Sequence, residues 1–81
     1  KLTQEELYLS PNPAYNSIYI PAGRAGDKIT FYSAAGAIAM EGILDENKKV
    51  STRELAKGLY TVSIYSSHAP IIRRSKLIIA D

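Results

Sequence analysis

The sequence predicts an all-β fold, specifically an immunoglobulin-like antiparallel β-sandwich of about seven short strands. Three observations support this prediction. Apolar and polar residues alternate in several short runs, which is the period of a strand with one buried face. Turn residues interrupt these runs about every eight to twelve residues. Finally, the chain shows neither the strand–helix–strand spacing of a parallel sheet nor an internal repeat.

The first part of the chain contains two expected strands separated by a rigid corner. A short strand over Leu7–Leu9 ends at Ser10–Pro13, because two prolines around an asparagine cannot continue a hydrogen-bond ladder. The next strand, Ser17–Ile20, places Ile18 and Ile20 on one face. We expect that face to contribute to the core.

A β-hairpin is expected in the middle of the chain. Ile29 and Phe31 alternate with polar neighbours, which predicts a half-buried strand. Gly36 is the best candidate for a positive φ in the turn that follows. Ile38 and Met40 should then continue the inward face on the returning strand.

One helical turn is expected near residues 52–57. Ser51–Glu54 has the Ser-x-x-Glu pattern of a capping box, and Gly58 stands where a glycine often ends a helix. The segment has room for little more than one turn. Leu55 and Ala56 are expected to close one end of the core.

The remaining strands are expected at Lys49–Ser51, Tyr60–Tyr65 and Ile71–Ile79. In the last of these, Leu77 and Ile79 should point inward and Ile78 outward. We also expect this strand to form an open edge, since terminal strands fray and present unpaired backbone groups. A partner could then read it by strand addition, and a strand-swapped homodimer could form.

Composition describes one small domain without strong electrostatic character. The 81 residues are 46% hydrophobic and 22% charged, with a formal net charge of +2 and no cysteine. The basic residues are spread along the chain, which argues against nucleic-acid binding. No apolar run approaches the length of a membrane span. Because the chain starts at Lys1, we interpret it as a piece of a longer precursor, with residues 1–6 as the end of a linker and 7–81 as the domain.

No constellation of residues predicts catalysis. His68 is the only histidine, and without cysteine or a second histidine it is interpreted as a solvated loop residue rather than a base or metal ligand. Asp45–Asn47 lacks the ligand spacing of a calcium loop, and no Gly-x-Ser-x-Gly elbow is present. We therefore predict a protein that is not an enzyme and has no cofactor and no metal.

Several segments together resemble one protein family. Leu9–Ala14 resembles its Tyr-Pro-Asn-Pro motif, and Lys28–Gly36 resembles its second motif, a strand running into a turn glycine. Leu55–Val62 resembles its most specific motif, and Lys76–Ile79 its terminal strand. In order and spacing these segments are similar to the C-terminal sorting domain of the type IX (Por) secretion system of Bacteroidetes, over about Leu7–Ile79.

The resemblance implies a secretion signal that directs a passenger protein through the outer-membrane translocon. It implies transit through the periplasm, then a location at the outer-membrane surface or outside the cell. The implied partners are the translocon, the outer-membrane shuttle and the sortase, with anionic lipopolysaccharide joined to the passenger. The domain would be either cleaved by the sortase or retained as a docking module.

Nine residues are the candidate recognition residues, and we expect Lys76 and Ile78 to make direct contacts. Ile78 is singled out because an outward-facing apolar side chain calls for an explanation. The nine are Pro11, Asn12, Pro13, Gly36, Gly58, Lys76, Leu77, Ile78 and Ile79.

Two other functions fit the sequence. The first is an adhesion or carbohydrate-binding module, which would need an exposed aromatic strip formed by Tyr15, Tyr19 and Tyr65. Tyrosines within strands are also simply good sheet formers. The second is a structural spacer between other domains.

Overall fold

The computed structural model describes residues 3–6, 9–66 and 71–80, and in this part of the chain it contains strands and turns. The strand expected at Leu7–Leu9 falls mostly outside the described residues, as does the loop that holds His68. No helix in the described part is long and apolar enough to span a membrane. The strands are β1 (Thr3–Glu6), β2 (Ser17–Tyr19), β3 (Lys28–Ser33), β4 (Ile38–Ile43), β5 (Lys49–Ser51), β6 (Gly58–Ser66) and β7 (Ile71–Ile79).

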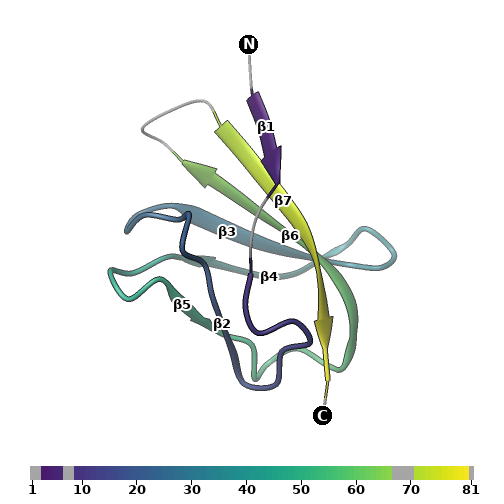
Figure 1. The fold of residues 1–81 in the computed structure, drawn as a ribbon. Coiled ribbons are helices and arrows are strands. Elements are labelled where there is room, and N and C mark those ends of the chain that lie inside the picture. Colours follow the sequence, from purple (N-terminus) through teal and green to yellow (C-terminus); the bar gives the residue numbers. More distant parts are fainter. Residues whose placement is uncertain (1–2, 7–8, 67–70, 81) are drawn as a thin grey trace.

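The strands form two sheets, as the sandwich prediction requires. The larger sheet has five strands in the order β1-β7-β6-β3-β4, and the smaller has two, β2 and β5. Figure 1 shows β2 and β5 as a separate layer beside the broad twisted sheet. Neighbouring strands are antiparallel except for β1, which pairs in parallel with β7. β1 lies within the polar segment that we expected to be linker, where no alternation indicates a strand.

One hydrophobic core fills the space between the layers. Its side chains come from the inward positions of the strands of both sheets and from the connecting loops. The alternation predicted for Ile18/Ile20, Ile29/Phe31 and Leu77/Ile79 is confirmed by their burial. The core residues are Leu9, Ala14, Ile18, Ile20, Ile29, Phe31, Leu44, Leu55, Tyr60, Val62, Ile64, Leu77 and Ile79.

The hairpin β3–β4 forms as expected, with one difference in its inward face. Gly36 has a φ of 89° in the connecting turn, a conformation that glycine adopts at no steric cost. Phe31 lies opposite Met40, but the register shifts between Phe31 and Tyr32. This irregularity turns the side chain of Ile38 away from the core and toward the surface, and Ile38 is 58% exposed. The expectation that Ile38 faces inward is therefore wrong, while Met40 packs against the core.

The helical turn expected near residues 52–57 is a single hydrogen-bonded turn. The Leu55 amide donates to the Thr52 carbonyl, and the Arg53 amide donates to the hydroxyl of Ser51. The segment is too short to propagate a helix, because one turn fixes many dihedral angles for one hydrogen bond. Leu55 is buried as predicted, whereas Ala56 is exposed.

β7 does not form the open edge that we expected. β6 occupies one side of it along its length, and β1 pairs with the other side from Ile71 to Arg74. Figure 1 shows β7 lying between β1 and β6, with a loop from early in the chain passing near its end. The same side of β7 near Ile78 is covered by Asn12 of the Pro-Asn-Pro corner, which lies more than sixty residues away in the sequence.

Candidate recognition site

The second half of β7 is closed by a clasp, which we define as Asn12 and Ala14 bonded to the segment 76–80. The side-chain amide of Asn12 donates to the Lys76 carbonyl at 3.1 Å, and its oxygen accepts from the Ile78 amide at 3.0 Å. The Ala14 amide then donates to the Ile78 carbonyl at 2.7 Å, and the Ala80 amide donates to the Ala14 carbonyl at 2.8 Å. The clasp therefore takes the place of a neighbouring strand.

The sequence around Asn12 explains why its side chain serves as the partner. Pro11 and Pro13 have no backbone N–H to donate to a ladder. An asparagine side chain carries the same donor and acceptor pair as a peptide group, so it can supply both hydrogen bonds. Immediately beyond, Ala14 resumes backbone pairing through a parallel bridge to Ile79 and is fully buried.

We call the side of the five-stranded sheet that faces away from β2 and β5 the outer face. Strand alternation puts Leu59, Thr61, Ser63 and Tyr65 of β6 on it. Their cross-strand partners on the same face of β7 are Ile78, Lys76, Arg74 and Ile72. Leu59 is 47% exposed and its cross-strand partner Ile78 is 49% exposed. An apolar pair thus lies at the surface, beside the end of the terminal strand.

A depression with a volume of about 490 Å³ lies on this face. Its lining comes from the end of β3, the hairpin turn after it, the start of β6 and the middle of β7. Arg74 and Lys76 supply its positive charge, and no carboxylate is among its lining residues. The lining residues are Tyr32, Ser33, Ala34, Gly36, Leu59, Tyr60, Thr61, Arg74 and Lys76.

The net charge of the outer face differs between the β3–β4 strands and β7. On the β3–β4 side, Lys28 and Glu41 neutralise each other in a salt bridge of 3.2 Å. On the β7 side, Arg74 and Lys76 are exposed, and neither forms an ion pair with any described residue. Positive charge is therefore concentrated on the side of the depression formed by β7.

The structure brings most of the candidate recognition residues together. Asn12 is bonded to Lys76 and Ile78 through the clasp, with Pro11 and Pro13 on either side of it in the chain, and Gly36 lines the depression. Gly58 pairs with Ile79 at the start of β6. Lys76 and Ile78 are exposed as expected, whereas Leu77 and Ile79 are buried in the core.

Seven of the nine residues that line the depression were not among the predicted recognition residues, and they include Tyr32, Leu59 and Arg74 from three different strands. Strand alternation alone could have placed each of these three on the outer face. It could not show that they surround the same spot, because that depends on the register between three strands that are distant in the sequence.

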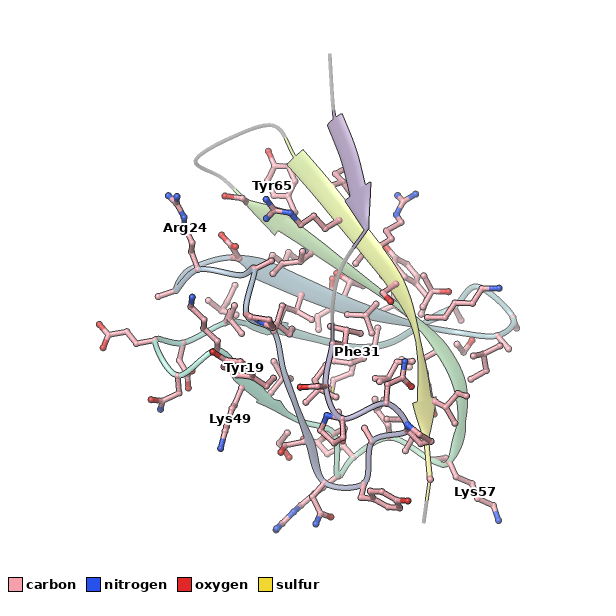
Figure 2. All side chains as sticks on the ribbon, in the orientation of Figure 1. Tyr19, Arg24, Phe31, Lys49, Lys57 and Tyr65 are labelled. Atoms are coloured by element: carbon pink, nitrogen blue, oxygen red, sulfur yellow. The ribbon has the colours of Figure 1, made fainter. Side chains whose placement is uncertain are left out.

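The three tyrosines of the adhesion hypothesis do not form a strip. Tyr65 lies on the outer face at the end of β6, whereas Tyr19 belongs to β2 in the smaller sheet. Figure 2 shows these two side chains on well-separated parts of the molecule. Among the described residues no group of three or more His, Asp or Glu side chains is arranged to hold a metal ion.

Taken together, these features define a small β-sandwich domain with a pinned terminal strand and an exposed apolar and basic face. Comparison with known families identifies the chain more closely. Residues 8–80 match the model of the secretion system C-terminal sorting domain. The chain therefore belongs to this family, and it is a sorting signal of type IX secretion that leads to export to the cell surface or beyond it.

Two individual proteins are similar to this chain, one in sequence and one in fold. Beta-agarase A of Zobellia galactanivorans is 28% identical over 71 residues, which cover 86% of this chain and 13% of the agarase. PorZ of Porphyromonas gingivalis, a surface component of the type IX secretion system, superposes with a TM-score of 0.69 at 16% identity. That match covers 93% of this chain and 11% of PorZ, and it shows the common fold.

Proposed function

We propose that the secretion machinery recognises this domain in its folded form, through the side chains on the outer face of its terminal strand. The observation that carries the proposal is the clasp. Asn12 and Ala14 occupy the backbone groups on the open side of segment 76–80, while Lys76 and Ile78 remain exposed. A partner therefore meets side chains there, and strand addition at this position would first have to displace the clasp.

The nine candidate residues divide into two roles under this proposal. Lys76 and Ile78 make contact with the machinery. The others support the fold around the contact strand: Asn12 through the clasp, with Pro11 and Pro13 beside it in the chain, Leu77 and Ile79 through the core, Gly58 through its pairing with Ile79, and Gly36 through the β3–β4 turn. Gly36 and Gly58 both have positive φ, at 89° and 149°, which side chains other than glycine rarely adopt.

We infer that the partners are the translocon, the outer-membrane shuttle and the sortase, encountered after transit through the periplasm. Anionic lipopolysaccharide would be joined to the passenger rather than to this domain. The matching region in beta-agarase A is 13% of that protein, which is consistent with a signal carried by a larger passenger. The domain itself would catalyse no reaction. It would comprise residues 7–81 together with β1, which pairs with β7, and the passenger would precede it.

Export of a reporter tests the proposal. Residues 1–81 are fused to the end of a periplasm-compatible fluorescent protein and expressed in a type IX-competent cell, where the reporter should reach the cell surface. Removing residues 78–81 should leave the reporter in the periplasm, since it removes Ile78 and the backbone groups that hold the clasp. Surface delivery of this truncated fusion at the normal level would disprove the proposal.

A point variant separates recognition from folding. Ile78→Ser changes a half-exposed side chain outside the core, so the domain should stay folded, with its melting temperature lowered by less than about 8 °C. Its fusion should nevertheless be exported less efficiently. The matched control is Ile43→Ser on β4, which changes a side chain that is 68% exposed on the same sheet but away from the clasp.

A further inference from the structure

The depression on the outer face exists because a short side chain is surrounded by longer ones. The strand register places Tyr32, Thr61 and Lys76 in one row across β3, β6 and β7. Thr61 is at the centre of this row, with Leu59 two residues before it on the same face. Arg74, two residues before Lys76, borders the same space.

The two sides of the depression differ in chemistry. On one side are the ring of Tyr32 and the aliphatic side chain of Leu59, and the exposed Ile78 extends this apolar surface. On the other side are the guanidinium of Arg74 and the ammonium of Lys76. A ligand that fills the depression therefore meets apolar surface and positive charge within one small site.

The clasp connects this site to the Pro-Asn-Pro corner. The carbonyl of Lys76 accepts a hydrogen bond from Asn12, and the amide of Ile78 donates one back. The backbone that carries the cationic side of the depression is thereby held at two points. Such preorganisation lowers the entropy lost when the site binds a ligand.

We propose that the depression binds an acidic peptide segment in which an aliphatic residue lies next to a carboxylate. The carboxylate pairs with Arg74 and Lys76, since arginine clusters recognise anionic peptide motifs through charge-assisted hydrogen bonds. The aliphatic side chain covers Leu59 and Tyr32. The inference rests on the proposed function, because it assumes that the acidic segment belongs to a protein of the secretion machinery.

Charge complementarity favours this ligand over other anions. Two cations of the lining have no ionic partner among the described residues, which favours a negatively charged ligand. Burying the exposed aliphatic pair Leu59 and Ile78 under apolar side chains of a ligand is favourable in free energy. A peptide carries such side chains, and a nucleic-acid backbone lacks them. The modest positive charge of the whole chain, +2, also differs from that of a nucleic-acid-binding domain.

Binding of a defined probe tests the chemistry. The probe is a fluorescent peptide of alternating glutamate and leucine, and its comparison peptide has lysine in place of glutamate. Wild-type domain should bind the acidic probe, more weakly as salt increases, and should not bind the basic one. The double variant Arg74→Glu/Lys76→Glu should bind the acidic probe with an affinity at least about tenfold lower than that of the wild type. Binding that is absent, or equal for both peptides, would overturn the proposal.

Two further variants distinguish binding at the depression from a general effect of the charge of the domain. Lys49→Glu reverses an exposed charge on β5, in the smaller sheet, and should leave probe binding unchanged. Thr61→Tyr fills the centre of the depression and should abolish binding without changing charge. Undiminished binding of the acidic probe by Thr61→Tyr would show that the depression is not the binding site.

Crosslinking in the cell identifies the natural ligand. A photo-reactive amino acid at position 61 of the reporter fusion should crosslink to an acidic stretch of a secretion-machinery protein, mapped by mass spectrometry. A crosslink to glycan or to a segment without carboxylates would overturn the inference. Normal export of Arg74→Glu/Lys76→Glu would disprove this inference and the contact proposed for Lys76. Reduced export of Ile78→Ser in the same assay would show that recognition through the outer face of the terminal strand still holds.

Discussion

The inner and outer faces of strands β6 and β7 show two uses of the same backbone. On the inner face, Tyr60, Val62 and Leu77 are between 0% and 8% exposed and belong to the hydrophobic core. On the outer face, Leu59 and Ile78 are about half exposed although both are large and apolar. Successive residues of one strand therefore serve different purposes. The inner residues stabilise the fold, and the outer residues remain available to a partner.

This difference also explains how a domain of 81 residues can present its terminal strand without leaving it loose. The inner side chains Leu77 and Ile79 hold the strand by burial, and the clasp satisfies its backbone. Only the outer side chains of this strand remain exposed and without a packing partner in the core. A small domain with a stability of about 4–12 kcal/mol can keep such a surface only if its core is well packed.

The largest effect is expected from breaking the inner face at the terminal strand. Leu77 is fully buried, so Leu77→Ala should destabilise the domain by about 2–5 kcal/mol through lost burial and a residual cavity. Ile78→Ala, on the neighbouring residue but the outer face, should cost less than about 1 kcal/mol. Urea denaturation of both variants measures the difference. Equal destabilisation would show that the two faces do not differ as described.

A second test adds volume to the core instead of removing it. A Cβ at Gly23 would overlap the side chain of Leu44 and touch that of Ile64, so Gly23→Ala should cost about 1–3 kcal/mol. Gly42 on β4 has open space where its Cβ would lie, so Gly42→Ala should be neutral or slightly stabilising. Thermal unfolding should separate the two variants. A tolerated Gly23→Ala would mean that Leu44 moves aside easily.

A third test opens the clasp. Asn12→Ala removes both side-chain hydrogen bonds to segment 76–78 and should cost about 1 kcal/mol, because the bonds are exposed to solvent. The effect should be local, with faster hydrogen exchange at the Ile78 amide and unchanged exchange at Val62 in the centre of β6. Asn47→Ala, on an exposed residue of the loop before β5, is the control. Unchanged exchange at Ile78 would contradict the clasp.

The smallest expected effect concerns a polar atom on the buried side. The hydroxyl of Thr52 is fully buried and has no hydrogen-bond partner among the described residues. Thr52→Val replaces it with a methyl group of similar size and should stabilise the domain by about 0.5–1 kcal/mol. Thr61→Val on the outer face should change stability by less than that. Destabilisation by Thr52→Val would mean that the hydroxyl is satisfied in solution.

Much of the fold could be predicted from local patterns. The period of two in Ile29–Phe31 and Tyr60–Ile64 identified inward residues correctly, because each pattern depends only on strand geometry. Gly36 was identified as the turn residue for the same local reason. The misplacement of Ile38 arose from an irregular register between two strands, which no local pattern contains.

The candidate site was predicted less completely than the fold. The Pro-Asn-Pro corner and the terminal strand were each predicted from local residues, and the resemblance to a known family marked both as recognition segments. That they contact each other through Asn12 follows only from the three-dimensional arrangement. The open edge expected for β7 was wrong for the same reason, since its partners β1 and Ala14 lie more than sixty residues away.

The sequence by itself determined which side chains face inward in the regular strands, where the turns fall and which family the chain resembles. These properties depend on residues close together in the chain, where backbone geometry sets the side-chain period. The tertiary structure alone decided that β7 lies inside a sheet, that Asn12 closes its edge, and that Arg74 and Lys76 share a depression with Leu59. Those properties depend on long-range strand pairing, because register between distant segments is set by the packing of the whole core.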